Sequence, residues 1–295
     1  HKILALVNKG TVRGWDDPRL FTLMGLQRRG MPAEGINNFV TDTGYTRNQQ
    51  TIDAKRLNTA CRAVLDTRAP RGMAVLRPLK IVLTNVPEDF SEEISVPDFP
   101  AAPEKGSHTV NICRVLYIES TDFRDEDTKG YYGMAPGKTV MLKYFGPVTC
   151  KNVVTEPDGA ISHIECERPE SPPEGRIKGA LHWVSSRRPS ELPAAAEVRL
   201  YEPLFVTDEV GSSGDWWSEL NSESEEVLPH CMIDASLAAA ATAVGAEFQF
   251  ERHGFFVVDK DTRDANLVFN RTLTLRESTD AKKVKGGATK GGKKA

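Results

Sequence analysis

The spacing of apolar residues changes near residue 70, from the three- and four-residue intervals of helices to the shorter runs typical of strands. Before that point, the segment 17–29 predicts a helix, with Asp17 as its N-cap and Pro18 at its first position. Gly30 would end this helix, because glycine readily adopts the left-handed conformation that follows a helix.

Two more helices are expected before the period changes. One begins near Pro32 and ends at Gly44. The other begins after a capping Asp53 and ends at Pro70, because the residue before a proline is pushed out of the helical region. Helical spacing gives this last helix an inward face made of Leu57, Cys61, Val64 and Leu65.

From residue 71 onward, short β-branched and aromatic runs predict about eight to ten strands, with no helices at the spacing of strand–helix–strand units. We therefore expect a mainly β protein with an N-terminal helical subdomain and two antiparallel β-barrels. The expected strand regions are 71–86, 110–120, 138–154, 161–167, 177–186, 197–205, 247–259 and 267–276.

This pattern predicts a helical subdomain over residues 1–70 and a region of two barrels, proximal and distal, over residues 71–277. The proline- and acid-rich segment 86–107 and the segments 168–177 and 185–195 are interpreted as loose surface connections, and the acidic segment 208–238 could hold a short helix. Residues 278–295 are a Lys/Gly-rich stretch that cannot bury a core, so we expect a disordered tail that attracts polyanions.

The charge is unevenly distributed along the 295 residues, although the net charge is only -3. Residues 1–80 hold 14 basic and 6 acidic side chains, and residues 281–295 hold six lysines and no acid. The intervening residues hold 18 basic and 35 acidic side chains. A basic first quarter on an acidic body favours one surface that faces a polyanion, while chance segregation in a solvated protein remains the alternative.

The cysteines and the hydropathy bear on location. The five cysteines lie far apart and form no CxxC pair, which argues against a zinc site and fits a reducing compartment. No apolar run approaches the roughly 20 residues of a membrane span, and the first residues do not resemble a signal peptide. We therefore expect a cytoplasmic protein with no membrane partner.

The usual signatures of catalysis are missing. The sequence has no GxxxxGK[ST] phosphate loop, GxSxG elbow, HExxH helix or GxGxxG turn, and its six histidines show no metal-ligand or triad spacing. We expect no catalytic residue, metal or cofactor in these residues. A self-contained hydrolase would need clustered carboxylates, and the acidic segment 217–226 is better interpreted as a solvated loop.

Four motifs together carry a family resemblance: GWDDPR at 14–19, APRGMAV at 69–75, HWVS at 182–185 and FQFER at 248–252. In this order they resemble glutaminyl-tRNA synthetase, a class I aminoacyl-tRNA synthetase, from residue 2 to about residue 277. The last three separate the chain from the related eukaryotic glutamyl-tRNA synthetases, which remain an alternative.

The resemblance implies the part of the enzyme that follows its catalytic centre, namely a helical subdomain and two anticodon-binding barrels. The KMSKR-type loop of the ATP- and glutamine-binding domain would end immediately before His1. The whole enzyme would join glutamine to its tRNA through an aminoacyl-adenylate, with ATP and magnesium. These residues alone should be inactive. Their expected partners are the anticodon arm and inner corner of glutamine tRNA and the catalytic domain, with no DNA. A free-standing RNA-binding module is the alternative from another class.

Matched to the family motifs, Arg71, Gln249 and Arg252 resemble residues that contact anticodon bases. Their planar side chains suit the edges of unstacked bases. A spacing of three on a strand would put Gln249 and Arg252 on opposite faces unless a bulge or strand end intervenes. The alternatives are a junction salt bridge for Arg71, and an ion pair of Arg252 with Glu251 or Glu247.

Further RNA contacts are expected on the distal barrel. Tyr132 and Gly133 stand where the family often carries a Lys-Arg pair, and Met141 stands where some bacterial members carry an arginine. Lys129, Lys138 and Lys143 could replace that charge, and Tyr131 or Tyr132 could stack on a base unless they face the barrel core or solvent.

In the helical part, five arginines are candidates for salt-dependent phosphate contacts, and any one of them could instead be solvated. They are Arg13, Arg19, Arg28, Arg29 and Arg47. Trp15 and Phe21 are expected in the core rather than in base stacking.

Overall fold

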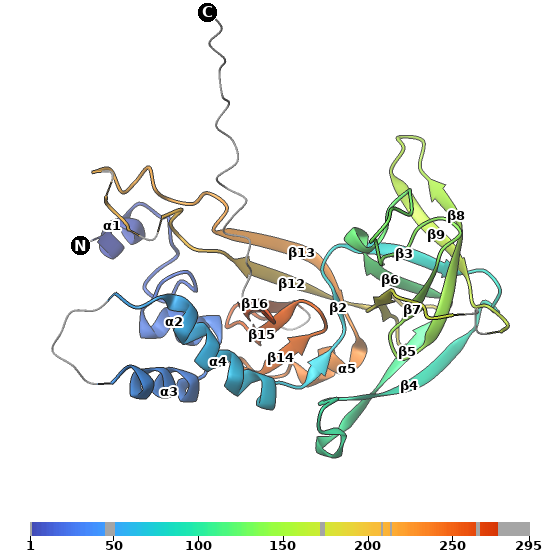
Figure 1. Cartoon of the computed structure of the whole chain (residues 1–295), viewed down its shortest axis with the longest axis horizontal. Coiled ribbons are helices and arrows are strands. Elements are labelled where there is room, and N and C mark those ends of the chain that lie inside the picture. Colours follow the sequence, from blue (N-terminus) through green and yellow to red (C-terminus); the bar gives the residue numbers. More distant parts are fainter. Residues whose placement is uncertain are drawn as a thin grey trace, which may run out of the picture.

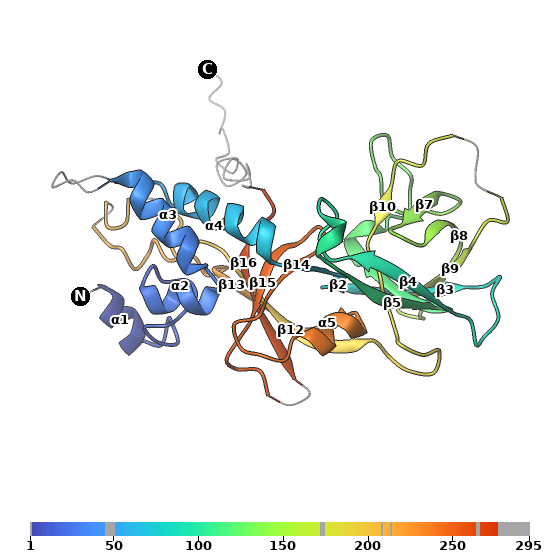
Figure 2. The ribbon, with the colours of Figure 1, turned by 90° about the horizontal axis from the view of Figure 1, so that it is seen from below.

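The computed structural model describes residues 2–44, 51–171, 175–207, 209–212, 214–263 and 266–276. Three parts follow one another along the long axis: a group of helices, a central barrel-like sheet and a second barrel-like sheet (Figures 1 and 2). This confirms the expected mainly β fold with an N-terminal helical region. Arg47 and residues 278–295 lie outside the described residues.

The helices come first in the chain, and two of them match the sequence prediction closely. Pro32 and Gly44 flank the third helix, and Asp53 caps the fourth, whose four predicted inward residues are all buried. Gly35 of the third helix lies directly against the Cys61 backbone of the fourth. The helices are α1 (Lys2–Asn8), α2 (Leu23–Arg29), α3 (Ala33–Thr43) and α4 (Ala54–Arg68).

The start of α2 differs from the prediction. Its N-cap is Thr22, whose hydroxyl accepts from the backbone N–H of Gly25. The buried carboxylate of Asp17 instead accepts from the backbone N–H groups of Arg13 and Arg19 and from the Arg19 guanidinium. Asp17 therefore organises the loop before α2 rather than the helix itself.

The central sheet, called the proximal barrel here, has the strand order β1-β14-β15-β16-β12-β13-β2. Aromatic side chains fill its core, with Phe250 stacked on Phe256 and in edge contact with Phe269. The inner face of α4 packs on Phe255 and Leu273 of this sheet. The strands are β1 (Arg71–Gly72), β2 (Ala74–Val75), β12 (Ala194–Tyr201), β13 (Glu225–Ile233), β14 (Glu247–Phe250), β15 (Gly254–Val258) and β16 (Leu267–Leu273).

The distal barrel has the strand order β10-β7-β8-β9-β3-β6-β11 and is inserted in the chain between β2 and β12. Trp183 is among its largest fully buried side chains. Its strands are β3 (Pro78–Leu83), β6 (Val115–Glu119), β7 (Thr139–Leu142), β8 (Gly146–Thr155), β9 (Ile161–Glu167), β10 (Ala180–Leu181) and β11 (Val184–Ser185).

Neither sheet is purely antiparallel, which corrects part of the prediction. The proximal barrel contains the parallel pairs β1–β14 and β12–β16, and the distal barrel contains β3–β9 and β7–β10. Parallel neighbours need a long connection. Here each of these connections contains other strands, so the absence of crossover helices did not exclude parallel pairing.

Both acidic segments, 86–107 and 208–238, hold strands, so the first is not a loose connection. In the first, β4 (Ser91–Pro97) pairs with β5 (Ser107–Cys113) as a two-stranded ribbon. In the second, β13 pairs with β12 over most of its length and is followed by α5 (Ala235–Ala240). Much of β4 and β13 is exposed or half-buried, and this explains their polar composition.

Candidate nucleic-acid interface

Arg71 and Gln249 lie side by side on neighbouring strands. In the parallel pair β1–β14 they are direct partners, and the Gln249 N–H donates to the carbonyl of Pro70 at 2.9 Å. Paired residues of a sheet extend from the same face. Gln249 is only 4% exposed, whereas the side chain of Arg71 is 27% exposed. The pairing of β1 with β14 thus brings the sequence motifs APRGM and FQFER together.

Arg252 lies in the tight turn between β14 and β15, with a φ of 68°. The strand ends at Phe250, so the alternation of faces does not apply to Gln249 and Arg252. The Arg252 guanidinium donates two hydrogen bonds to Asp122, at 2.5 and 2.8 Å, in the short helical turn η2 (Ser120–Asp122) of the distal barrel. Its side chain is nevertheless 45% exposed.

Glu251 is the residue that contacts polar and basic side chains on the other side of this turn. Its carboxylate accepts from Lys143 Nζ at 2.6 Å and from the Tyr144 hydroxyl at 3.3 Å, and lies 3.9 Å from Arg71 Nη1. Burial and the neighbouring Glu251 raise the pKa of Tyr144 to about 12. Arg71 therefore does have a weak junction ion pair, and Arg252 pairs with Asp122 rather than with Glu251 or Glu247.

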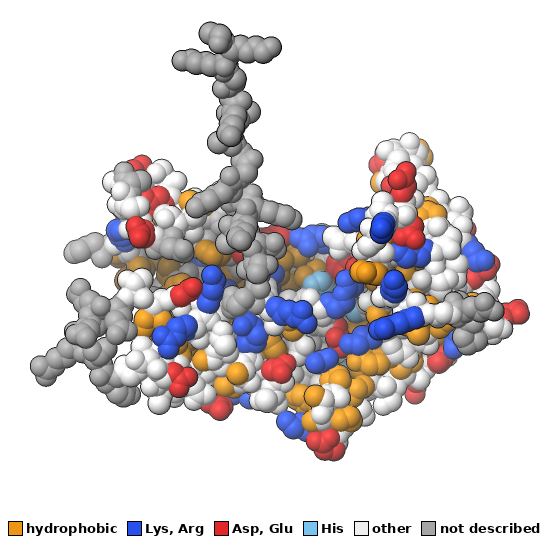
Figure 3. Space-filling model, viewed as in Figure 1, with side chains coloured by type: hydrophobic (Ala, Val, Ile, Leu, Met, Phe, Trp, Pro, Cys, Tyr) orange, Lys and Arg blue, Asp and Glu red, His pale blue; other side chains and the backbone are white. Residues whose placement is uncertain are grey.

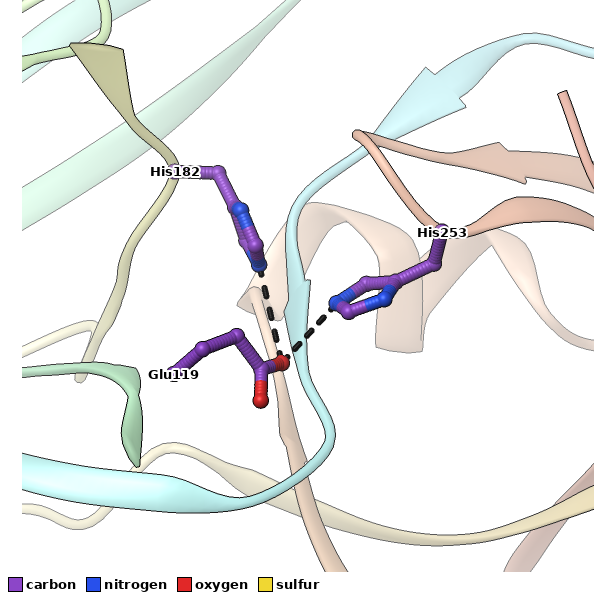
Figure 4. A group of neighbouring side chains, drawn as sticks. All are labelled: Glu119, His182 and His253. Carbon is purple, nitrogen blue, oxygen red and sulfur yellow. Dashed lines mark hydrogen bonds and ion pairs between the residues drawn. The ribbon is translucent and has the colours of Figure 1, made fainter. Parts of the chain in front are cut away.

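Behind Arg252, two histidines meet one carboxylate at the junction of the barrels (Figure 4). His253 Nε2 lies 2.8 Å from Glu119 Oε1, and His182 Nε2 lies 3.7 Å from the same oxygen. Glu119 also accepts from the backbone N–H groups of Leu76 and Arg77. Burial alone would raise the pKa of Glu119, but the two imidazoles and the backbone donor hold it well below its ordinary value.

These three residues form the one group of metal-ligating type that the described part of the chain brings together. Two imidazoles and one carboxylate do not suit Mg²⁺, which prefers oxygen ligands. Glu119 is ionised and can only accept, so His253 Nε2 carries a proton toward it. That nitrogen offers no lone pair to a metal.

On the distal barrel, four of the five predicted residues line a cavity of about 640 Å³. Tyr132 is largely exposed there, while the ring of Tyr131 already contacts the guanidinium of Arg124 and the ammonium of Lys138. The predicted residues on its wall are Lys129, Tyr131, Tyr132 and Lys138, and Arg176 and Lys178 join them. Lys143 faces Glu251 at the junction instead.

Three of the helical arginines are used inside the protein. The side chains of Arg19 and Arg28 are less than a tenth exposed. Arg19 pairs with Asp17, and Arg28 pairs with Asp259 and Asp261. Arg29 donates to the carbonyl of Thr272, and burial lowers its pKa to about 10. The structure does not support phosphate contacts for these three.

The remaining helical residues are more accessible. Arg13 is partly exposed and pairs with Glu225 at 2.6 Å. Trp15 and Phe21 are exposed, which corrects their expected place in the core. They belong to a group of exposed apolar side chains on the helical part that also includes Leu4, Leu23 and Met24.

Lys and Arg side chains form a band across one face of the molecule, from the helices to the distal barrel (Figure 3). Histidine side chains are visible within this band, and acidic side chains are fewer there than at its edges. Sequence reasoning missed Asp122, Glu119, His182 and His253 as members of the junction. No local spacing could have shown them, because they come from segments far apart in the chain.

Comparison with known families agrees with this geometry. Sequence models described as "tRNA synthetases class I (E and Q), anti-codon binding domain" match residues 69–168 and 180–259. A model described as the catalytic domain of the same family matches residues 1–67. The chain belongs to the class I tRNA synthetases (E and Q).

Similar curated proteins narrow the family further. The "Probable glutamine--tRNA ligase" of Dictyostelium discoideum is 44% identical over 283 residues, covering 96% of this chain and 36% of its own length. The glutamine–tRNA ligase of Nitrobacter winogradskyi is 41% identical, covering 92% and 49%, and the cytoplasmic one of Arabidopsis thaliana is 43% identical, covering 94% and 35%. The chain thus corresponds to the C-terminal part of a glutaminyl-tRNA synthetase and spans a third to a half of these relatives.

Proposed function

We propose that this chain binds the anticodon arm of glutamine tRNA, and that Arg71, Gln249 and Arg252 contact its bases. The observation that carries the proposal is their convergence: one strand pair and the turn that follows it bring all three to the barrel junction. The band of Lys and Arg side chains on one face of the molecule would hold the phosphates without reading sequence (Figure 3).

The chemistry of Arg252 supports base contact. A guanidinium has five N–H donors in one plane. Asp122 occupies one on each terminal nitrogen, and His182 Nδ1 lies 3.3 Å from Nη1. The donors on Nε and the remaining one on Nη2 have no partner among the described residues. They lie on the same edge of the plane, which is the geometry of a bidentate contact with a base edge.

We infer that the whole protein ligates glutamine to its tRNA through an aminoacyl-adenylate, in the cytoplasm, and that these residues alone are inactive. ATP and Mg²⁺ would be used outside them, since the sequence has no phosphate loop and the junction cluster does not suit Mg²⁺. The names of the relatives support glutamine rather than the glutamate of the related eukaryotic enzymes.

A free-standing RNA-binding module is less well supported. Such a module would be expected to bury its large apolar side chains, yet Leu23 of α2 is 74% exposed and its neighbours Phe21 and Met24 are exposed too. Contiguous exposed apolar side chains mark surfaces that another part of a protein covers. In the ligase interpretation, that part is the rest of the catalytic domain.

The test is filter binding of the chain to glutamine tRNA transcripts with the normal anticodon and with one anticodon base changed at a time. We expect tighter binding to the normal anticodon, and Arg71→Ala, Gln249→Ala and Arg252→Lys should each reduce that preference roughly tenfold. Arg188→Ala is a matched control, because this exposed arginine pairs with Glu191, its one ion-pair partner among the described residues. Equal binding of all transcripts by the unmodified chain would refute anticodon reading.

A further inference from the structure

The neighbours of Arg252 suggest how its guanidinium is held. On one side, the Asp122 carboxylate fixes the two terminal nitrogens from the distal barrel. On the other side, the imidazole of His182, between β10 and β11, presents its Nδ1 to Arg252 Nη1 at 3.3 Å. The arginine comes from the proximal barrel, so both contacts cross the junction.

The tautomer of His182 follows from the hydrogen-bond roles. An arginine N–H can only donate, so His182 Nδ1 must be the acceptor and must be unprotonated. A neutral imidazole then carries its proton on Nε2, which faces the Glu119 carboxylate 3.7 Å away. This nitrogen is fully buried with no hydrogen-bond partner among the described residues. Because Nε2 carries a proton, it cannot bind a metal ion, so the cluster is better explained as a support than as a metal site.

The charges around His182 favour this neutral form only in part. Burial lowers its pKa, and the positive Arg252 and the neighbouring His253 act in the same direction, while Glu119 opposes them. Asp122 binds the Arg252 guanidinium that His182 also contacts. Adding a proton to Nδ1 would turn the acceptor into a donor and place an imidazolium against a guanidinium. The orientation of Arg252 should therefore depend on a neutral His182.

We propose that His182 is a positioning residue for base recognition: its Nδ1 accepts from Arg252 and, together with Asp122, fixes the plane of the guanidinium so that the Nε–Nη2 edge faces the anticodon. This rests on the proposed function of Arg252. Glu119, held by His253 and by the backbone of Leu76 and Arg77, fixes the opposite edge of the imidazole ring.

Two amide substitutions at His182 test the roles of its two ring nitrogens separately. In His182→Asn the side-chain amide stands near the position of Nδ1 and keeps an acceptor for Arg252. In His182→Gln the longer side chain places its amide near Nε2, so the contact with Arg252 is lost. Because a hydrogen bond to a charged group is involved, His182→Gln should reduce the preference for the normal anticodon roughly tenfold, and His182→Asn by less than about threefold.

The experiment is filter binding of the full chain and both variants to the same set of transcripts, below the thermal unfolding temperature of each. For the unmodified chain, the preference should stay constant from pH 7.5 to about 6.5, because the pKa of His182 is lowered, and it should fall only at more acidic pH. His182→Asn should remove most of that fall. If neither variant folds, the pH profile of the unmodified chain decides, and a preference that already falls between pH 7.5 and about 6.5 overturns the proposal.

The outcomes separate the two hypotheses. If the unmodified chain shows no anticodon preference, or if Arg252→Lys keeps it, the role of Arg252 fails and the role of His182 falls with it. If Arg252→Lys loses the preference but His182→Gln keeps it, only the positioning role is wrong. If both His182 variants weaken the binding of all transcripts alike, the residue is merely structural and the proposal is overturned.

Discussion

Replacing Arg28 by methionine should strongly destabilise the contact between the helices and the proximal barrel. Arg28 donates to the fully buried Asp259 at 3.0 and 3.1 Å, to Asp261 at 2.8 Å and to Asp16 at 3.3 Å. Removing it leaves a buried carboxylate without its main partner, and such losses cost about 3–5 kcal/mol.

The expected loss is at the lower end of that range, about 3 kcal/mol, because Asp259 keeps other partners. Arg199 Nη1 lies 3.5 Å from it, Asn270 donates to it, and the Asp261 N–H donates to it at 2.9 Å. Burial alone would raise the pKa of Asp259, but hydrogen bonding to Arg28 keeps it lowered. The stability from this pair is therefore present above the ordinary carboxyl pKa near 4 and is lost as the pH falls below it.

Urea unfolding followed by circular dichroism at pH 7 measures the loss, with an expected midpoint shift of about 1 M. Arg188→Met is the control, and its exposed pair with Glu191 should contribute less than about 1 kcal/mol. A loss below about 1 kcal/mol for Arg28→Met would refute the reasoning from burial. Under conditions where the variant is folded, the salt dependence of its tRNA binding should equal that of the unmodified chain.

Three further predictions concern packing, pH and charge. Gly35→Ala should cost about 1–3 kcal/mol in the same urea assay, because a Cβ there would lie 2.6 Å from the Cys61 Cα; a neutral effect would contradict the close packing of α3 on α4. The lowered pKa of His182 means that the unfolded chain takes up a proton that the folded chain does not. The free energy of unfolding should therefore decrease as the pH falls below about 6.5, and less so in His182→Asn; equal slopes would argue against a neutral His182. Deleting residues 278–295 should weaken all RNAs alike and lower the salt slope, whereas Lys129→Ala should lower it by no more than about one; any change in anticodon preference would show that these lysines read bases.

The helices that the sequence predicted best are those whose ends depend on local chemistry. Asp53 and Gly44 act on groups within a few residues of themselves, so their roles can be recognised from neighbouring letters. Asp17 has the same chemistry but is used by Arg19 in a buried turn, and Thr22 caps the helix instead. A capping residue can be predicted from sequence only where no stronger partner is close in space.

The sequence predicted the candidate site less completely than it predicted these helices. The family resemblance indicated Arg71, Gln249 and Arg252, while spacing alone left the last two on opposite faces. The buried arginines were misassigned because their partners are distant in the chain: Arg28 binds an aspartate 231 residues away. Basic side chains look alike in sequence whether they meet a phosphate or a buried carboxylate.

The insertion of one barrel within the other has a consequence for the order of folding. Every strand of the distal barrel has been synthesised once the chain reaches Ser185. In contrast, β1 cannot pair with β14 until the chain has been synthesised as far as Gln249, the partner of Arg71. Closing so long a loop is slow, and non-local pairings delay folding. On the ribosome, the distal barrel should therefore form first and hold the two ends of the unfinished proximal barrel near each other. The junction residues that we propose contact bases would then be assembled last.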